Sequence, residues 1–239
     1  MLTAFYEQEQ PSPLDPVHSP TFDGMLRRFL SYLWPIQEVQ AEGRHGELTV
    51  RWEAGVKVLN SEQGNQSFGA LHRVWQAVFT HLELARTPPR DVLLLGLGGG
   101  SVPAILRDEL GIDTPITAIE LDPAMIDLAQ THFGLRRHQE LQVILGDATI
   151  QVHALRMRFH LVLVDLFDDL DLARGVDART FLHGLRDRCA DDGMVCFNTV
   201  AYDEASDLRC QAVHDQAVKI FNKVYELRLE GMNRVFIAT

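Results

Sequence analysis

Hydrophobic residues in the second half of the chain form short, nearly unbroken runs that alternate with helical patterns. The runs predict five strands, at residues 92–95, 116–119, 141–145, 161–164 and 194–197. Helical spacing lies between them, at residues 102–110, 123–133, 148–155 and 178–189. Strands that are apolar on both faces and alternate with helices are typical of a parallel sheet covered on both sides. The pattern therefore predicts an α/β fold with a Rossmann-like, mostly parallel sheet.

The first 90 residues carry a different pattern. Helical spacing over residues 22–33 predicts a short amphipathic helix that docks on the elements after it. Apolar and polar residues alternate over 48–52, and a second apolar run follows a turn at 56–59, which is the signature of a β-hairpin. A second amphipathic helix is predicted over 71–82.

These patterns divide the chain into three parts. Residues 1–35 form a proline-rich leader and the short helix, 36–66 a small β-hairpin region, and 67–239 the Rossmann-like domain. The last part ends with a helix over 204–221 and an antiparallel hairpin over 224–238 that closes the sheet.

Composition limits the partners and the compartment. The 239 residues carry a formal net charge of −11, which argues against nucleic acid or an anionic membrane as the main partner. Apolar runs stay well below the ~20 residues of a membrane-spanning helix. The 3 cysteines lack C-x-x-C spacing, and the 10 histidines lack paired metal-binding spacing. We therefore expect a cytoplasmic protein without a metal that takes a small-molecule partner.

A glycine-rich turn follows the first strand of the parallel sheet. It contains Gly96, Gly98, Gly99 and Gly100, and Ser101 opens the next helix. Glycines let a backbone approach a ligand closely, and a helix N-terminus presents free N–H groups. The turn nearly matches the dinucleotide fingerprint, but Ser101 replaces its last glycine. We expect all five residues to bind a cofactor; the alternative is that the glycines only permit a tight turn.

Acidic residues follow the next two strands at their carboxyl ends, where open α/β sheets bind ligands. Glu120 can accept hydrogen bonds from two ribose hydroxyls. Asp147 can accept from an adenine amino group, while the backbone N–H of Ala148 meets a ring nitrogen. Helix capping is the alternative interpretation of Asp147, and it is the preferred one for Asp122 beside Glu120.

The fourth strand ends in an acidic loop that contains Asp165 and Asp168. Asp165 follows four apolar residues, so its carboxylate stands where a buried strand leaves the core and should face the ligand crevice. We expect Asp165 and Asp168 to be the catalytic pair and to hold a cationic group.

Together these features describe the S-adenosylmethionine (SAM)-binding fold of class I methyltransferases better than a nicotinamide domain. More narrowly, the chain resembles the spermidine synthase (polyamine aminopropyltransferase) family across about residues 45–200. The matching segments are the hairpin end at 55–59, the glycines at 98–100, and the runs at 119–122, 146–148 and 163–168. The resemblance implies that SAM or decarboxylated SAM is the co-substrate, that a methyl or aminopropyl group passes to a small amine-bearing acceptor, and that the chain forms a homodimer.

Several positions depart from the polyamine-forming members. Ser101 stands where they carry an Asp that holds the amino end of the decarboxylated co-substrate. Since a serine does not repel a carboxylate, ordinary SAM is at least as suitable here. Phe68 and Gly69 stand in place of a Tyr-Gln pair, and Leu166 and Phe167 replace small polar residues. Two alternatives therefore stay open: a non-catalytic adenosyl-binding protein and an NAD-dependent oxidoreductase.

Overall fold

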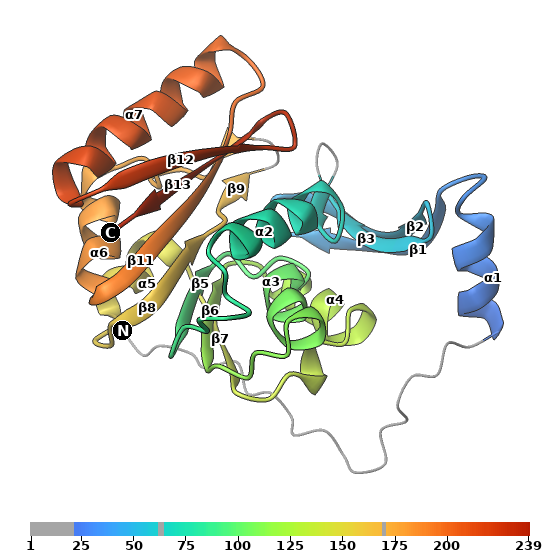
Figure 1. Ribbon diagram of the computed structural model, residues 1–239. Helices are drawn as coiled ribbons and strands as arrows, with labels where there is room; N and C mark the ends of the chain where they lie inside the picture. Colours follow the sequence, from blue (N-terminus) through green and yellow to red (C-terminus); the bar gives the residue numbers. More distant parts are fainter. Residues whose placement is uncertain (1–21, 62–64, 169–170) are drawn as a thin grey trace.

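A seven-stranded sheet forms the centre of the computed structural model, which describes residues 22–61, 65–168 and 171–239 (Figure 1). Its strands are β5 (Val92–Leu95), β6 (Ile116–Glu120), β7 (Leu141–Leu145), β8 (Phe159–Val164), β11 (Cys189–Val200), β12 (Val224–Leu229) and β13 (Asn233–Ala238). They lie in the order β12-β13-β11-β8-β5-β6-β7. The strands from β11 to β7 run parallel, and β13 is antiparallel to both β11 and β12. The predicted α/β fold with an antiparallel C-terminal hairpin is confirmed.

Helices cover both faces of this sheet (Figure 1). Alternate residues of β5 point to opposite faces, so Leu94 belongs to one hydrophobic core and Leu93 to the other. One face packs against α2 (Ala70–His81), α3 (Ser101–Ala104) with the π-helical turn Ile105–Glu109, and α4 (Pro123–His132). The other packs against α5 (Ala148–Ala154), α6 (Arg179–Arg188) and α7 (Glu204–Ile220). Burial on both faces explains why the strands read as unbroken apolar runs.

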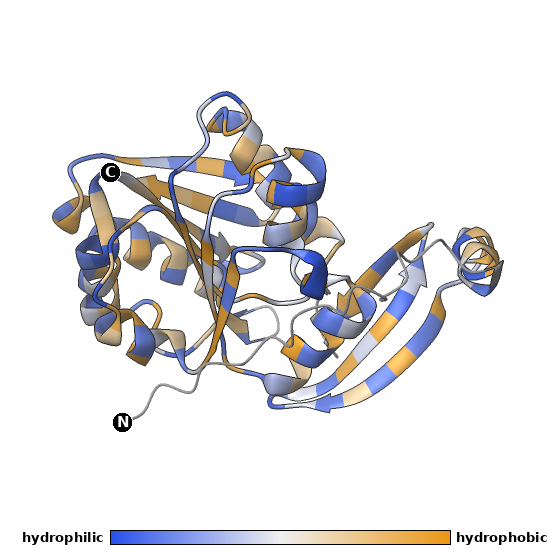
Figure 2. Cartoon of the chain, turned by 90° about the horizontal axis from the view of Figure 1, so that it is seen from below, coloured by the Kyte–Doolittle hydropathy of each residue, from blue (hydrophilic) through white to orange (hydrophobic). Residues whose placement is uncertain are grey.

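A smaller antiparallel sheet precedes the central one. It contains β1 (Ile36–Gly43), β2 (Gly46–Glu53), β3 (Val56–Asn60) and β4 (Asn65–Ser67), in that order. Hydrophobic and hydrophilic residues alternate along its strands (Figure 2). Leu48, Val50 and Leu59 pack on Met125 and Leu128 of α4, which attaches this sheet to the Rossmann-like part. The predicted hairpin is β2–β3, whereas the pattern had not indicated β1 and β4.

The first helix leaves most of its apolar side chains exposed. α1 (Phe22–Leu30) is at the end of the small sheet that is remote from the central sheet (Figure 1). Its C-terminal turn is held by Ser31, whose hydroxyl accepts from Gly55 N at 2.9 Å. Phe29 and Trp34 are 70% and 77% exposed. The expected docking is thus limited to the C-terminal end of the helix, where it meets the β2–β3 hairpin. Within residues 22–61, 65–168 and 171–239, its larger apolar side chains are not covered. The leader, up to residue 21, lies outside the described residues.

Candidate functional site

A cavity of about 680 Å³ opens at the carboxyl ends of the parallel strands. Its volume is within the range of roughly 300–1,000 Å³ that is typical of small-molecule sites. The walls come from the central strand ends, the β1–β2 turn at Arg44 and His45, and the turn of the C-terminal hairpin at Met232 and Asn233. Many of the residues proposed from sequence line it: Gly96, Gly98, Glu120, Asp147, Ala148, Asp165 and Asp168.

The first position of the turn, Gly96, has no room for a side chain. Gly96 has φ +92°, and a Cβ there would lie 2.1 Å from the backbone oxygen of Asp165. A side chain would therefore collide with the neighbouring strand end as well as strain the backbone. Gly96 keeps the turn and the loop at Asp165 in contact at the base of the cavity.

The last part of the turn, from Gly99 to Ser101, lies beside the end of the small sheet. Gly99 N donates to Ser67 Oγ at 2.7 Å, and Ser101 Oγ accepts from Phe68 N at 2.8 Å. Ser101 is 3% exposed, and Gly100 has a left-handed conformation with φ +92°. The structure places Gly99, Gly100 and Ser101 outside the cavity lining. The bonds of Gly99 and Ser101 attach the turn to the end of β4 and the residue after it.

Glu120 is surrounded by backbone donors. Its Oε2 accepts from Leu97 N at 3.0 Å and Gly98 N at 3.1 Å, while Oε1 accepts from Leu121 N and Asp122 N at 2.8 and 3.0 Å. Burial raises the pKa of Glu120, and these hydrogen bonds oppose the rise. A carboxylate has about four lone-pair positions, so a ligand hydroxyl must share or replace one of these donors.

Asp147 and Asp122 both cap helices. Asp147 Oδ1 accepts from Thr149 N at 2.8 Å and from Thr149 Oγ1 at 2.6 Å at the start of α5. Asp122 Oδ1 accepts from Ala124 N at 2.9 Å at the start of α4. Its second oxygen accepts from Arg44 N at 2.6 Å and ties the β1–β2 turn to the cavity rim. Both hydrogen bonds of the cap use Oδ1, and Asp147 also lines the cavity, so the capping and ligand-binding interpretations are compatible.

Asp165 lies at the end of β8 with both carboxylate oxygens engaged. Trp75 Nε1 donates to Oδ2 and Asn198 Nδ2 donates to Oδ1, each at 2.9 Å. Burial raises the pKa of Asp165 to about 6; the Asn198 and Trp75 hydrogen bonds oppose the rise, and the charge of Glu120 adds to it. The cavity therefore holds a carboxylate that is harder to ionise than an ordinary aspartate.

Asp168 lies three residues further along the same loop. It belongs to the short strand β9 (Phe167–Asp168), which pairs with β10 (Asp171–Leu172). His45 Nδ1 lies 3.4 Å from Asp168 Oδ1, so the β1–β2 turn approaches the acidic loop across the mouth of the cavity. With 53% of its side chain exposed, Asp168 is a rim residue.

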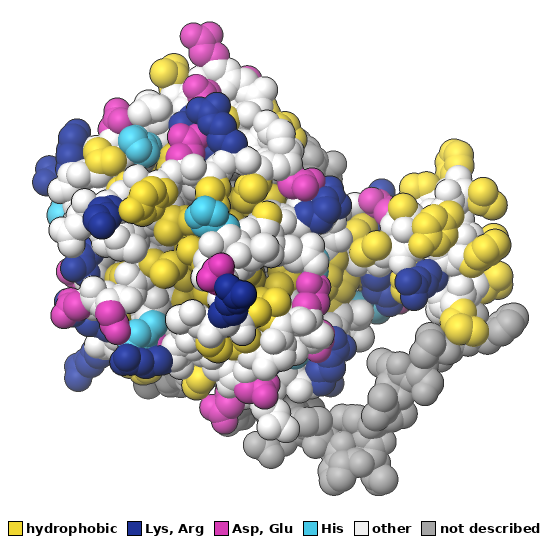
Figure 3. Space-filling model, in the orientation of Figure 1, with side chains coloured by type: hydrophobic (Ala, Val, Ile, Leu, Met, Phe, Trp, Pro, Cys, Tyr) yellow, Lys and Arg dark blue, Asp and Glu magenta, His cyan; other side chains and the backbone are white. Residues whose placement is uncertain are grey.

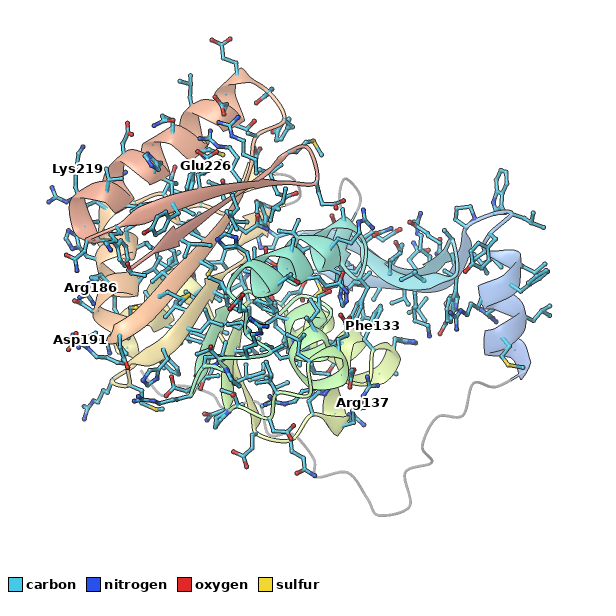
Figure 4. All side chains as sticks on the ribbon, viewed as in Figure 1. Phe133, Arg137, Arg186, Asp191, Lys219 and Glu226 are labelled. Atoms are coloured by element: carbon cyan, nitrogen blue, oxygen red, sulfur yellow. The ribbon has the colours of Figure 1, made fainter. Side chains whose placement is uncertain are left out.

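The aromatic contact to Asp165 had not been foreseen. Phe68, assigned to the position of the family's tyrosine, instead stacks on Phe133 with ring centroids 4.8 Å apart (Phe133 is labelled in Figure 4). Trp75 is the aromatic residue that reaches Asp165. Its helical spacing indicated a core residue, and it is fully buried, but the same position also points its indole N–H at the strand end.

A metal site and a membrane-spanning helix each have requirements that the described residues do not meet. Within residues 22–61, 65–168 and 171–239, the His, Cys, Asp and Glu side chains form no group of three that could hold a metal ion. Over the same ranges, no helix has the length and apolar character needed to cross a membrane.

Residues 73–227 match the spermine/spermidine synthase domain family. The chain is also 28% identical over 225 residues to the eEF1A lysine and N-terminal methyltransferase homolog of Drosophila melanogaster. That alignment covers 82% of this chain and 33% of the relative, so the chain spans about a third of the relative's length.

Solved structures share the fold. A probable spermidine synthase from Corynebacterium glutamicum gives a TM-score of 0.70 at 13% identity, over 84% of this chain and 79% of that one. Human methyltransferase-like protein 13 in complex with SAH gives 0.59 at 22% identity, over 72% and 82%. These likenesses show the class I methyltransferase fold, and the first extends over more of the chain.

Proposed function

Because this chain belongs to the spermine/spermidine synthase domain family, we propose that it is a transferase that moves a methyl or aminopropyl group from SAM or decarboxylated SAM to an amine. The observation that carries the proposal is the shared cavity. Glu120, Asp147 and Asp165 follow three different strands, yet all three line it. A ribose-side acid, an adenine-side acid and an acceptor-side acid thus face one space of about 680 Å³.

The cavity fits an adenosyl ligand. Gly96 and Gly98 provide backbone without side chains, and Glu120 offers a carboxylate for ribose hydroxyls. When bound, the ligand supplies a carbon activated by a sulfonium. The chain's own residues hold it, orient the acceptor and exclude water.

The co-substrate is proposed to be SAM at least as readily as its decarboxylated form. Ser101 is neutral, and its hydroxyl accepts from Phe68 N, so an acidic side chain is missing from this position. Ser101 lies outside the cavity lining, so its effect is indirect: unlike an aspartate, it adds no negative charge in the turn beside the cavity that would repel a co-substrate carboxylate.

The acceptor is proposed to be a small amine, and Asp165 and Asp168 its partners. An alkyl ammonium has a pKa near 10 and must lose a proton before it attacks carbon. Even with its pKa raised to about 6, Asp165 is a weak base for this proton. Its main role is to hold and orient the cation, with Asp168 adding negative charge at the rim.

A protein amine is a second candidate acceptor. The name of the Drosophila melanogaster relative refers to a lysine and an N-terminus, both of which are amines. The same two aspartates would serve a lysine side chain, since its charged group is also a primary ammonium.

A transfer assay tests the proposal. Labelled SAM and decarboxylated SAM are offered with a panel of polyamines, other small amines and lysine peptides. Asp165→Asn should abolish turnover and leave adenosyl binding measurable, whereas Asp168→Asn should lower turnover less because Asp168 is a rim residue. A panel without any product would favour a non-catalytic adenosyl-binding protein, and unchanged turnover in Asp165→Asn would remove this residue from the catalytic pair.

We also propose that the chain is a cytoplasmic homodimer. Cys189, Cys196 and Cys210 are all free and buried, which suits a reducing compartment. Apolar side chains gather over α1 and the turn after it (Figure 3). Patches of this kind on a protein surface are typical of protein contacts, and a second copy would cover this one.

A further inference from the structure

Asp165 is fixed by two side chains with no place in the transfer chemistry. Trp75 holds Oδ2 and Asn198 holds Oδ1, each at 2.9 Å. Trp75 and Asn198 are both 0% exposed, so water does not compete for either donor. Holding both oxygens fixes the plane of the carboxylate as well as its place at the end of β8.

A third residue fixes the orientation of Asn198. An asparagine amide has a donor end and an acceptor end, and only the donor end suits a carboxylate. Asn233 Nδ2 donates to Asn198 Oδ1 at 3.1 Å. Asn233 is on β13, and its bond occupies the acceptor oxygen of the Asn198 amide. The N–H₂ group of Asn198 is therefore directed at Asp165. Asn233 also lines the cavity, so the hydrogen bonds from Asn233 to Asn198 and from Asn198 to Asp165 begin at the cavity wall.

We propose that Trp75, Asn198 and Asn233 are positioning residues that aim the Asp165 carboxylate at the acceptor ammonium. The inference rests on the proposed function, because Asp165 meets an ammonium only if an amine is the acceptor. Each oxygen of Asp165 accepts one of these two bonds and keeps a second lone-pair position for the ligand.

The chemical type of these donors matters. An indole and an amide are neutral, so they orient the carboxylate without cancelling its charge, as an arginine or lysine partner would. They also favour the charged form, which burial disfavours. The cavity lining that includes Asp165 has other ionisable side chains: the acids Glu120, Asp122, Asp147 and Asp168, and the basic residues Arg44, His45 and Arg174. Of these, Glu120 opposes ionisation of Asp165 through its negative charge.

The indole of Trp75 provides a readout that needs neither acceptor nor turnover. The chain has 3 tryptophans, so ¹⁵N-tryptophan labelling gives a simple NMR spectrum of indole N–H signals. In the wild type, the Trp75 signal should titrate with a midpoint near the Asp165 pKa of about 6. The same step should be absent in Asp165→Asn, which identifies its source.

Two variants test the positioning role. Asn198→Leu and the milder Asn233→Leu should each raise this midpoint, the former by ~1 pH unit, because a favourable hydrogen bond to the anion is lost or loosened. Thr199→Val is the matched control: it removes the buried 2.7 Å bond from Thr199 Oγ1 to Arg234 O on the same strand, and its midpoint should stay at the wild-type value. In the transfer assay, both leucine variants should raise the acceptor KM and lower kcat while the adenosyl Kd is unchanged.

A wild-type midpoint in both folded leucine variants, or equal shifts in the control, would overturn the inference. If Asn198→Leu does not fold, Asn233→Leu decides alone, since Asn233 is only partly buried. Failure of the proposed function is detected separately, as absence of adenosyl binding or of amine product in the wild type. The two failures are therefore distinguishable.

Discussion

The backbone amide of Arg44 donates a 2.6 Å hydrogen bond to the carboxylate of Asp122, which joins the N-terminal sheet to the rim of the cavity. Asp122 also caps α4, so one side chain fixes both the β1–β2 turn and the helix that follows β6. The turn brings Arg44 and His45 into the cavity lining. The N-terminal sheet therefore forms part of the cavity wall.

Asp122→Ser should separate these two roles. Serine can still cap α4, but its shorter side chain loses the bond to Arg44, so we expect the unfolding free energy to fall by about 1 kcal/mol and SAM affinity to fall several-fold. Asp203→Ser is the matched control, because Asp203 caps α7 away from the cavity lining. Denaturation and calorimetry measure both quantities. Equal SAM affinity in the two variants would show that the Arg44 contact has no role in binding.

Asp147→Ser separates capping from ligand binding in the same way. A serine retains the cap on α5, so stability should change by less than about 1 kcal/mol. The carboxylate that we propose for the adenine amino group is lost, so SAM affinity should fall about tenfold, equivalent to ~1.4 kcal/mol. Calorimetry compares the SAM affinity of the variant with that of the wild type, and denaturation checks that the two proteins are equally stable. A variant that binds SAM as tightly as the wild type would reduce Asp147 to a helix cap.

The raised pKa of Asp165 predicts a specific pH dependence of stability. The folded-state pKa is about 6, above the ordinary value of about 4, so between these pH values the folded protein binds more protons than the unfolded chain. Its contribution to the unfolding free energy must then decline as pH rises through that window. Urea denaturation of wild type and Asp165→Asn from pH 4 to 7 measures the difference, which isolates Asp165 from Glu120. A difference that is constant with pH would contradict the raised pKa.

The apolar surface at α1 predicts concentration-dependent association. Phe29 and Trp34 are 70% and 77% exposed, so Phe29→Glu with Trp34→Glu should convert a dimer to a monomer in light scattering. Ile150→Glu is the control, since Ile150 is 61% exposed on α5, elsewhere on the molecule. A monomeric wild type at every concentration, or equal dissociation in the control, would exclude this surface as the dimer contact.

Local sequence patterns predicted the central sheet because each element carries its own signal. The strands β5 to β8 are buried on both faces and read as apolar runs, and Asp122 with Pro123 marks the start of α4. The predicted strand ends also indicated that Glu120, Asp147 and Asp165 lie at one edge of the sheet, and all three line the cavity there. β1 was missed because a register shift between Gln37 and Val39 interrupts its alternation.

The support around Asp165 could not be predicted from sequence. Trp75 and Asn198 are respectively 90 and 33 residues away along the chain, and each carries an ordinary core pattern within its own element. Likewise, Ser101 belongs to a motif that indicates ligand contact, yet its hydroxyl accepts a hydrogen bond from Phe68 N in the connection between β4 and α2. These contacts depend on how distant elements pack, which local periodicity does not encode.

Calorimetric titration of the wild-type protein with SAM, decarboxylated SAM and methylthioadenosine tests the central claim most directly. We predict saturable binding with one site per chain for all three, and SAM at least as tight as the decarboxylated form because Ser101 replaces an acid. Tighter binding of decarboxylated SAM would overturn the co-substrate preference, and the absence of binding by all three would contradict an adenosyl site in this cavity.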